Sequence, residues 1–300
     1  MYLNFHKLFI AIGAGLFLLQ SCVLKAQNLH VFSVVESNDF NRADRLVDLD
    51  RVDKTAQRIS QYVGLDQYYY NFGTNNAFSV AAIRSSLARL GKISCSSDVI
   101  WFHFSGYGRN DGQSVWPVLK LTDGEIPLSE IVTILQQKQP KLLLITVEAG
   151  NKRADSKELS NQAGEEPDEA ETYKQRHLKR TAISPKISPP SMQKIPNFST
   201  IENYEKLFKQ YDGQKIVILG SCSVGQNSIS NSTGGSEWLN KFSKVFEQMT
   251  GEQTQSFSWE SINKQISTEI QEKFKGKQKP QASIKTISSD CETPNENAHE

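Results

Sequence analysis

Two hydrophobic periods alternate along the chain and predict strands and helices in turn. Unbroken apolar runs such as "DVIWFHF" and "PKLLLITVEAG" predict buried strands, and apolar residues three or four positions apart predict helices between them. The predicted strands cover residues 28–37, 67–73, 98–104, 140–150, 215–222 and 280–288, with a short hairpin around 116–124. The predicted helices cover residues 53–65, 77–91, 126–139, 200–213, 236–251 and 258–276.

This alternation predicts one α/β domain, in which a mostly parallel sheet carries helices on both faces. Several helix starts have supporting residues: Pro127 falls in a first turn, Thr200 is a candidate cap, and Ser258 and Ser261 have capping character. The elements after residue 200 are too few to bury a core of their own. We therefore expect them to extend the first sheet.

The first 27 residues have the pattern of a targeting segment. One lysine precedes an apolar run from Leu8 to Leu19, which is short for a membrane span and fits a secretory signal. "LQSC" resembles a bacterial lipoprotein box with acylation at Cys22, and "LKAQ" offers cleavage after Ala26; an uncleaved anchor is a third route. We expect export to the periplasm, the outer membrane or the medium, with membrane contact only through a lipid on Cys22.

The hydrophobic periods stop between residues 152 and 199. This segment has an acidic run, "GEEPDEAE", a basic run, "KQRHLKR", and the proline-rich "SPKISPPSMQKIP", which together predict a flexible linker. "RHLKR" would be a cleavage site for a trypsin-like enzyme, so whether the linker is cut is open. The predicted organisation is a signal segment 1–27, a first part 28–151, the linker 152–199, a second part 200–288 that completes the same domain, and a polar tail 289–300.

Charge and cysteine content narrow the function classes. The formal net charge is +1, which gives the whole chain no basic footprint for nucleic acid. Outside the targeting segment the cysteines are Cys95, Cys222 and Cys291, and none forms a Cys-x-x-Cys metal pair. We predict no metal and no cofactor. Export would allow one disulfide, Cys95–Cys222 or Cys222–Cys291, and the spacing does not decide between them.

The candidate site lies where three predicted strands end. In parallel sheets, ligands and catalytic groups gather at the carboxyl ends of the strands. The three ends are "SGYG" after strand 98–104, "VEAGN" at the end of strand 140–150, and "GSCSVGQNS" at the end of strand 215–222.

These stretches resemble the metacaspase and caspase-like cysteine peptidases. "DVIWFHFSGYGRNDGQSVWPVLKLTDGEIPLSEIVTIL" is similar to the family's apolar strand, Ser-Gly-His-Gly turn, hairpin and "IPL"-type helix. "PKLLLITVEAGN" is similar to the strand that ends in Asp-Cys-Cys-Asn or Asp-Ala-Cys, and "KIVILGSCSVGQNS", "WLNKF" and "GKQKPQASI" resemble the small-subunit half. The resemblance covers roughly residues 28–288. It implies a three-layer α/β/α caspase-like fold with six strands, a large-subunit part at 28–151, a small-subunit part at 200–288, and the linker at the family's processing loop.

The resemblance also implies a peptidase without its dyad. The family uses a cysteine thiolate as nucleophile and a histidine that takes its proton. Its motifs place the histidine at Tyr107 and the cysteine at Gly150, with Glu148 and Ala149 just before it. Gly150 has no side chain, and a tyrosine with a pKa of about 10 is a poor base at neutral pH.

Few neighbours offer a substitute for the dyad. His103 lies about 13 Å along the strand from Tyr107, at about 3.3 Å per residue, and we expect it and His30 to be structural. Cys222 is the best alternative nucleophile, and Ser105 and Ser221 are the other candidates. The segment 223–230, which resembles the acidic specificity segment of metacaspases, contains no carboxylate. The vestigial cleft would comprise Ser105, Gly106, Tyr107, Glu148, Ala149, Asn151, Ser221, Cys222 and Gln226.

The leading hypothesis is an exported caspase-like pseudopeptidase that binds a protein or a peptide. Its partner would be an active caspase-like homologue, another envelope protein, or a peptide across the old cleft. Tyr107 would then either help to bind that peptide or only pack in the turn. The alternative is a divergent, active cysteine endopeptidase that uses another nucleophile such as Cys222. A third hypothesis is a surface scaffold whose linker is processed, and a homodimer through strand 280–288 is a further option.

Overall fold

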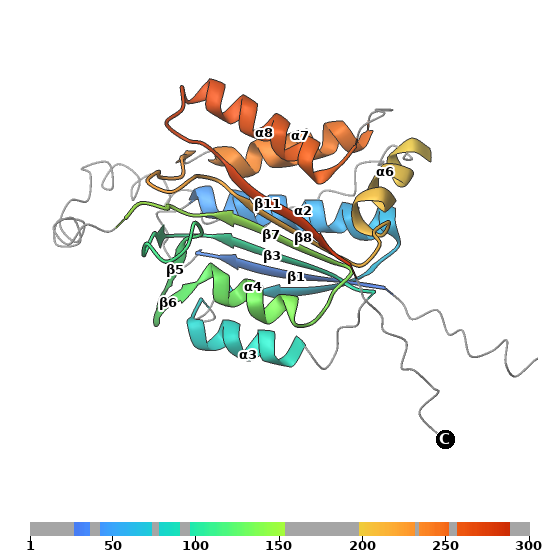
Figure 1. The fold of residues 1–300 in the computed structure, drawn as a ribbon, viewed down its shortest axis with the longest axis horizontal. Helices are drawn as coiled ribbons and strands as arrows, with labels where there is room; N and C mark the ends of the chain where they lie inside the picture. Colours follow the sequence, from blue (N-terminus) through green and yellow to red (C-terminus); the bar gives the residue numbers. More distant parts are fainter. Residues whose placement is uncertain are drawn as a thin grey trace, which may run out of the picture.

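A six-stranded sheet lies between two layers of helices (Figure 1). The computed structural model describes residues 27–36, 43–73, 78–90, 97–153, 198–231, 234–251 and 257–288. Five strands are parallel, and β11 at one edge is antiparallel to its neighbour β8. The strand order is β11 (Gln281–Ile287), β8 (Gln214–Gly220), β7 (Leu142–Glu148), β3 (Val99–Ser105), β1 (Asn28–Val35) and β2 (Asp66–Asn71). The predicted α/β/α fold with a mostly parallel six-stranded sheet is confirmed.

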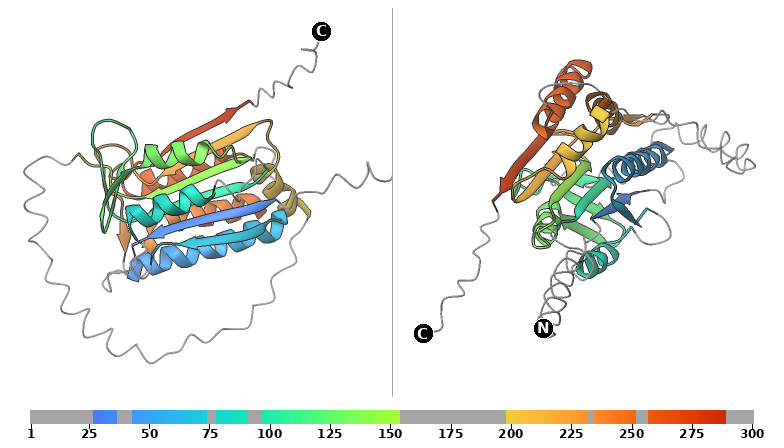
Figure 2. Two further views of the ribbon diagram at one scale, coloured as in Figure 1. Left: turned by 90° about the horizontal axis from the view of Figure 1, so that it is seen from below. Right: turned by 90° about the vertical axis from the view of Figure 1, so that its right-hand side faces the viewer.

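The helices divide unequally between the two faces of the sheet (Figures 1 and 2). One face carries α3 (Val80–Leu90) and α4 (Leu128–Gln136). The other face carries α2 (Ala43–Val63), α6 (Phe198–Phe208), α7 (Glu237–Gly251) and α8 (Trp259–Lys273). The second half of the chain thus supplies three helices and two strands of the six-stranded sheet, β8 and β11.

Burial on both faces explains the unbroken apolar runs. Trp101 of β3 packs into the core under α2, α7 and α8, while the adjacent Phe102 packs into the core under α3 and α4. A strand covered on both sides needs apolar residues at every position. Buried polar residues interrupt the pattern, and two of them lie at the carboxyl ends, where Ser105 of β3 pairs in register with Glu148 of β7.

A small three-stranded sheet and a two-stranded hairpin lie at the carboxyl end of the six-stranded sheet. The first contains β4 (Gly108–Arg109), β5 (Val118–Leu121) and β6 (Gly124–Pro127) and follows β3 directly. The second contains β9 (Ser230–Asn231) and β10 (Gly235–Ser236) and precedes α7. Both bring loop residues close to the predicted site.

Three helix starts differ from the predictions. The helix predicted from residue 53 begins at Ala43. The prediction started too late because the first turns are rich in charged residues, which do not fit an apolar periodicity, although Arg45 and Asp48 among them are buried. Pro127 ends β6 and precedes α4, and it does not lie in the first turn. Thr200 lies inside α6, which begins at Phe198, so it is not the cap. The cap at Ser258 is confirmed, since Ser258 and Ser261 form a reciprocal capping box.

Some predictions fall outside the described residues. The targeting segment, nearly all of the linker, the polar tail, Cys95 and Cys291 belong to them. Among the described helices, none combines the length and the apolar character that a membrane crossing requires. Cys222 is a free thiol in the described part of the chain, which also holds no group of three residues suited to a metal ion.

Candidate functional site

The turns after β3 and β7 touch each other at the carboxyl end of the sheet. The backbone N–H of Gly106 donates to the carbonyl oxygen of Glu148 at 3.1 Å. A Cβ atom on Gly108 would lie 2.8 Å from the carbonyl oxygen of Gly150, so only glycine fits this approach. The structure therefore brings together the turns that hold Tyr107 and Gly150, as expected for the ends of neighbouring parallel strands.

The two dyad positions of the resembling family differ in their surroundings. Tyr107 is about half exposed, with 51% of its surface accessible. A Cβ atom on Gly150 would meet the carbonyl oxygen of Gly108 at 3.1 Å and Oδ1 of Asn227 at 3.4 Å. A side chain at position 150 would therefore enter a narrow space, and the present residue offers neither a nucleophile nor an acid–base group.

Cys222 is buried, and its thiol is poorly placed to act as a nucleophile. Only 2% of its surface is exposed, and its Sγ donates to the carbonyl oxygen of Ala149 at 3.1 Å. Burial, together with the nearby carboxyl of Glu148, raises its pKa from 9.0 to about 12. A nucleophilic cysteine needs a lowered pKa and access to substrate, and Cys222 has neither.

We expect Cys222 to resist alkylation in the native protein. Raising a thiol pKa from 9.0 to about 12 lowers its thiolate fraction near neutral pH about 1000-fold. Iodoacetamide labelling with peptide mapping should leave Cys222 unmodified natively and modify it rapidly in concentrated urea. Mapping separates it from Cys95 and Cys291. Fast native labelling of Cys222 would contradict this assignment.

The two described histidines, His30 of β1 and His103 of β3, are buried and have structural hydrogen-bond partners. His103 is fully buried, its Nδ1 lies 2.9 Å from Thr146 Oγ1, and burial lowers its pKa to about 3. His30 is buried at the opposite end of β1, where its Nε2 lies 3.2 Å from Asp98. Neither is placed to take a proton from a group at the candidate site.

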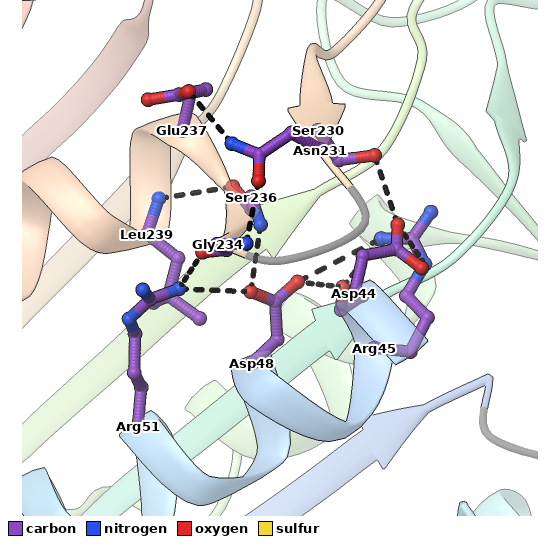
Figure 3. Close-up of polar contacts among 11 residues, drawn as sticks. Asp44, Arg45, Asp48, Arg51, Ser230, Asn231, Gly234, Ser236, Glu237 and Leu239 are labelled. Atoms are coloured by element: carbon purple, nitrogen blue, oxygen red, sulfur yellow. Dashed lines mark hydrogen bonds and ion pairs between the residues drawn. The ribbon is translucent and has the colours of Figure 1, made fainter. Parts of the chain in front are cut away.

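A buried network of charged residues lies beside the site (Figure 3). Asp48 of α2 is fully buried, and its Oδ1 accepts a hydrogen bond from the backbone N–H of Ser236 at 2.8 Å. Its Oδ2 accepts from the hydroxyl of Ser105 at 2.9 Å, and Arg45 donates to the same hydroxyl at 2.6 Å. One carboxylate thus joins helix α2 to the end of β3 and to β10.

The same network holds the hairpin β9–β10 against α2 (Figure 3). Ser230 donates to Asp44 at 2.9 Å, and Arg51 donates to the carbonyl oxygen of Gly234. Gly235 has a φ of +67° and approaches so closely that a Cβ atom would lie 2.4 Å from Asp48 Oδ1. This contact explains why a glycine stands there.

Glu148 is a second buried carboxyl group near this network. Its surface is 1% exposed, and neither of its carboxyl oxygens makes a hydrogen bond within the described residues. Burial raises its pKa to about 8; the charge of Asp48 adds to this rise, and Ser236, Arg45 and Ser221 oppose it. Burial also raises the pKa of Asp48, to about 6, against the hydrogen bonds and arginines around it. Near neutral pH, Asp48 is therefore ionised and Glu148 is protonated.

Asp48 and Arg45 were not predicted as site residues from the sequence. The segment 223–230 has no carboxylate, but Asp48 of α2 and Glu148 of β7 place two carboxyl groups at the carboxyl end of the sheet. Asp48 lies five residues before the predicted helix, and charged residues are rarely buried, so nothing marked it as internal. The available signal was its spacing of four and eight residues from Val52 and Ala56, which places it on the buried face of α2.

The remaining predicted site residues hold the loops together. Asn151 is fully buried, accepts from Nδ2 of Asn110 at 3.0 Å and donates to the carbonyl oxygen of Val115 at 2.9 Å. Its backbone N–H donates to Gln226 at 2.9 Å. Ser221 and Ala149 are buried, and Gly106 packs against the ring of Phe104. These residues frame the site and present no reactive group to solvent.

An open pocket of about 420 Å³ adjoins this frame. It lies between the loop after β4, the residues after Asn151 and the loop after β8. Its lining includes the exposed side chains of Val115, Val224 and Arg153. The arrangement can hold a ligand at the carboxyl end of the sheet.

A family model and two solved structures agree with this architecture. The family model described as Caspase domain matches residues 33–291. A crystal structure of a protein from Geobacter sulfurreducens shares 13% identity at a TM-score of 0.50, covering 87% of this chain and 94% of that one. Caspase-1 from Spodoptera frugiperda also shares 13% identity at a TM-score of 0.50, covering 88% and 90%. No curated protein matches the chain in sequence.

Proposed function

The chain belongs to the caspase-domain family, and we propose that it is a pseudopeptidase of this family that binds a protein or a peptide. The observation that carries the proposal is the glycine at position 150, where the family resemblance places the nucleophile. Tyr107 at the base position and the buried thiol of Cys222 support it. Catalysis by a thiolate needs a low-pKa cysteine within reach of a base, and the described residues provide no such pair.

The frame around the missing dyad supports a binding role. Asn110 and Asn151 join the loops by hydrogen bonds, and glycines at 108 and 150 keep the two turns in contact. Tyr107, Val115 and Val224 are among the most exposed large hydrophobic residues of the described chain, at 51%, 60% and 48%. Exposed apolar groups on a rigid rim are typical of interaction sites.

A peptidase assay with variants tests this proposal. We expect the purified mature chain to release no product above background from a mixed fluorogenic peptide library, with or without added calcium. The matched variant Cys222→Ala should behave identically. Hydrolysis by the wild type that disappears in Cys222→Ala would overturn the proposal in favour of a divergent cysteine endopeptidase.

We also propose that the protein is exported, with its binding face outside the cytoplasm. The apolar run Leu8–Leu19 and the two processing sequences at Cys22 and Ala26 support this. Mass spectrometry of the mature protein from its native cells should find a chain that starts at an acylated Cys22 or at Gln27. Recovery of an intact chain that starts at Met1 in the cytoplasm would contradict export.

A further inference from the structure

One cationic side chain lines the pocket at the carboxyl end of the sheet, and four more belong to segments joined to the loops that form it. Lys152 and Arg153 follow Asn151 directly, and Arg153 lines the pocket against Gly112. Lys275, Lys277 and Lys279 lie in the segment between α8 and β11. We call these five residues the basic rim.

Hydrogen bonds bring the two parts of the basic rim together. Gln226 donates to the carbonyl oxygen of Gly276 at 3.1 Å and accepts from the backbone N–H of Lys279 at 2.8 Å. Ser223 donates to the carbonyl oxygen of Lys279 at 2.9 Å. The loop after β8 is thus attached to the lysine segment, and this loop also bonds Asn151 and supplies Val224 to the pocket wall.

The basic rim carries charge that the described residues do not neutralise. All five side chains belong to exposed residues, and none of them forms an ion pair with a carboxylate of the described chain. Neighbouring cations differ, since Lys273 pairs with Glu237 and Arg109 pairs with Glu125. The described acids nearest in sequence are Glu148, which is buried, and Glu272. A local positive field therefore exists on a chain whose formal net charge is only +1.

The pocket beside the basic rim offers apolar contact as well as the charge of Arg153. Val115 is 60% exposed and Val224 is 48% exposed, and both line its wall. A nucleic acid or a lipid headgroup would use the cations but would leave these aliphatic side chains without a partner. An extended peptide can place carboxylates on the lysines and small apolar side chains in the pocket.

We propose that the basic rim docks an acidic peptide segment of a partner protein, with apolar side chains of that segment against Val115 and Val224. This inference rests on the proposed binding function and names the chemistry of its partner. Long-range attraction by the lysines and arginine speeds encounter, and the pocket wall fixes the position of the bound segment.

Binding of designed peptides tests the proposal. The probe is an eight-residue peptide of alternating valine and glutamate, compared with peptides that carry glutamine or lysine in place of every glutamate. We expect the acidic peptide to bind the full mature chain at least about tenfold more tightly than the glutamine peptide does. Its affinity should fall steeply with added salt. A chain whose acidic residues at 164–171 are replaced by Gln and Asn is measured in parallel, so that its own acidic run cannot compete.

A charge-matched pair of variants separates the basic rim from net charge. The triple change K275Q/K277Q/K279Q should lower the affinity for the acidic peptide at least about tenfold and reduce the salt dependence of binding. The control K206Q/K244Q/K264Q removes three exposed lysines of α6, α7 and α8 and should bind as the wild type does. Val224→Ser should lower the affinity for the valine–glutamate peptide without changing the salt dependence of binding.

Two results would overturn the docking proposal. One is equal loss of binding in the rim variant and the control variant, or no preference for the acidic peptide. The other is tighter, rim-dependent binding of a single-stranded oligonucleotide or of phosphatidylglycerol vesicles. The peptidase assay is independent of both, because hydrolysis would contradict the pseudopeptidase proposal whether or not the rim variants lose binding.

Discussion

Replacing Asp48 by alanine is expected to lower the free energy of unfolding by about 3–5 kcal/mol, the usual cost of removing one partner from a buried charged network. The carboxylate accepts hydrogen bonds from Ser236 and Ser105, and it lies 3.9 Å from Arg45 and 3.6 Å from Arg51. Its loss leaves the backbone N–H of Ser236 and the hydroxyl of Ser105 without this acceptor, and it removes the negative charge beside the two arginines. A domain of this size has a free energy of unfolding of about 5–15 kcal/mol, so the variant would be marginal.

A nearby residue on the same helix provides the control. Asp50 is exposed and pairs with Lys54, so Asp50→Ala should change the unfolding free energy by less than about 1 kcal/mol. Urea denaturation followed by tryptophan fluorescence measures both variants. Hydrogen exchange in Asp48→Asn should also show lost protection at residues 234–239, since the hairpin β9–β10 is attached to α2 through this carboxylate. An Asp48→Ala protein as stable as Asp50→Ala would refute the role given to the network.

The fold was predictable because its strands are buried on both faces. The runs at 98–104 and 140–150 could hardly be anything but central strands, and parallel strands must end at the same edge. That rule alone brought the turns of Tyr107 and Gly150 together. Helix boundaries were less certain, since α2 begins ten residues before its predicted start, in a stretch rich in charged side chains.

The buried charges at the site were not predictable in the same way. Asp48 meets Ser105 and Ser236, which lie 57 and 188 residues away along the chain. A charged side chain is normally read as exposed, and only tertiary packing shows that α2 turns this carboxylate inward. Glu148 was named from its place before Gly150, but its unpaired carboxyl oxygens and raised pKa depend on neighbours from α2, β8 and β10.

Raising the pH is expected to destabilise the protein through Glu148. The pKa of Glu148 is about 8 in the folded chain and 4.5 as its ordinary value, so the folded state binds more protons than the unfolded state between these limits. The stabilising contribution of Glu148 is therefore fully present below its ordinary pKa, and it is lost as the pH rises through about 8. Asp48 acts in the same direction, but only up to its folded pKa of about 6.

Between about pH 7 and about pH 8.5, Glu148 is the main buried group whose titration changes the free energy of unfolding. His30 and His103 have lowered pKa values, so they oppose the trend only below 6.5, their ordinary pKa. Cys222 begins to destabilise the folded state only above its ordinary pKa of 9.0. Within the interval, the wild type should lose about 1 kcal/mol of unfolding free energy through Glu148.

The variant Glu148→Gln isolates this effect, because glutamine has nearly the shape of the protonated acid and does not titrate. Its stability advantage over the wild type should widen by about 3 kcal/mol between about pH 5.5 and about pH 8.5. Glu130→Gln is the control, since Glu130 is a partly exposed partner of Arg84 and should leave the pH profile of the wild type unchanged. Parallel profiles for the wild type and Glu148→Gln would mean that water already reaches this carboxyl group in the folded chain. Diverging profiles would mean that the carboxyl group of Glu148, two residues before Gly150, is sealed from solvent in the folded chain.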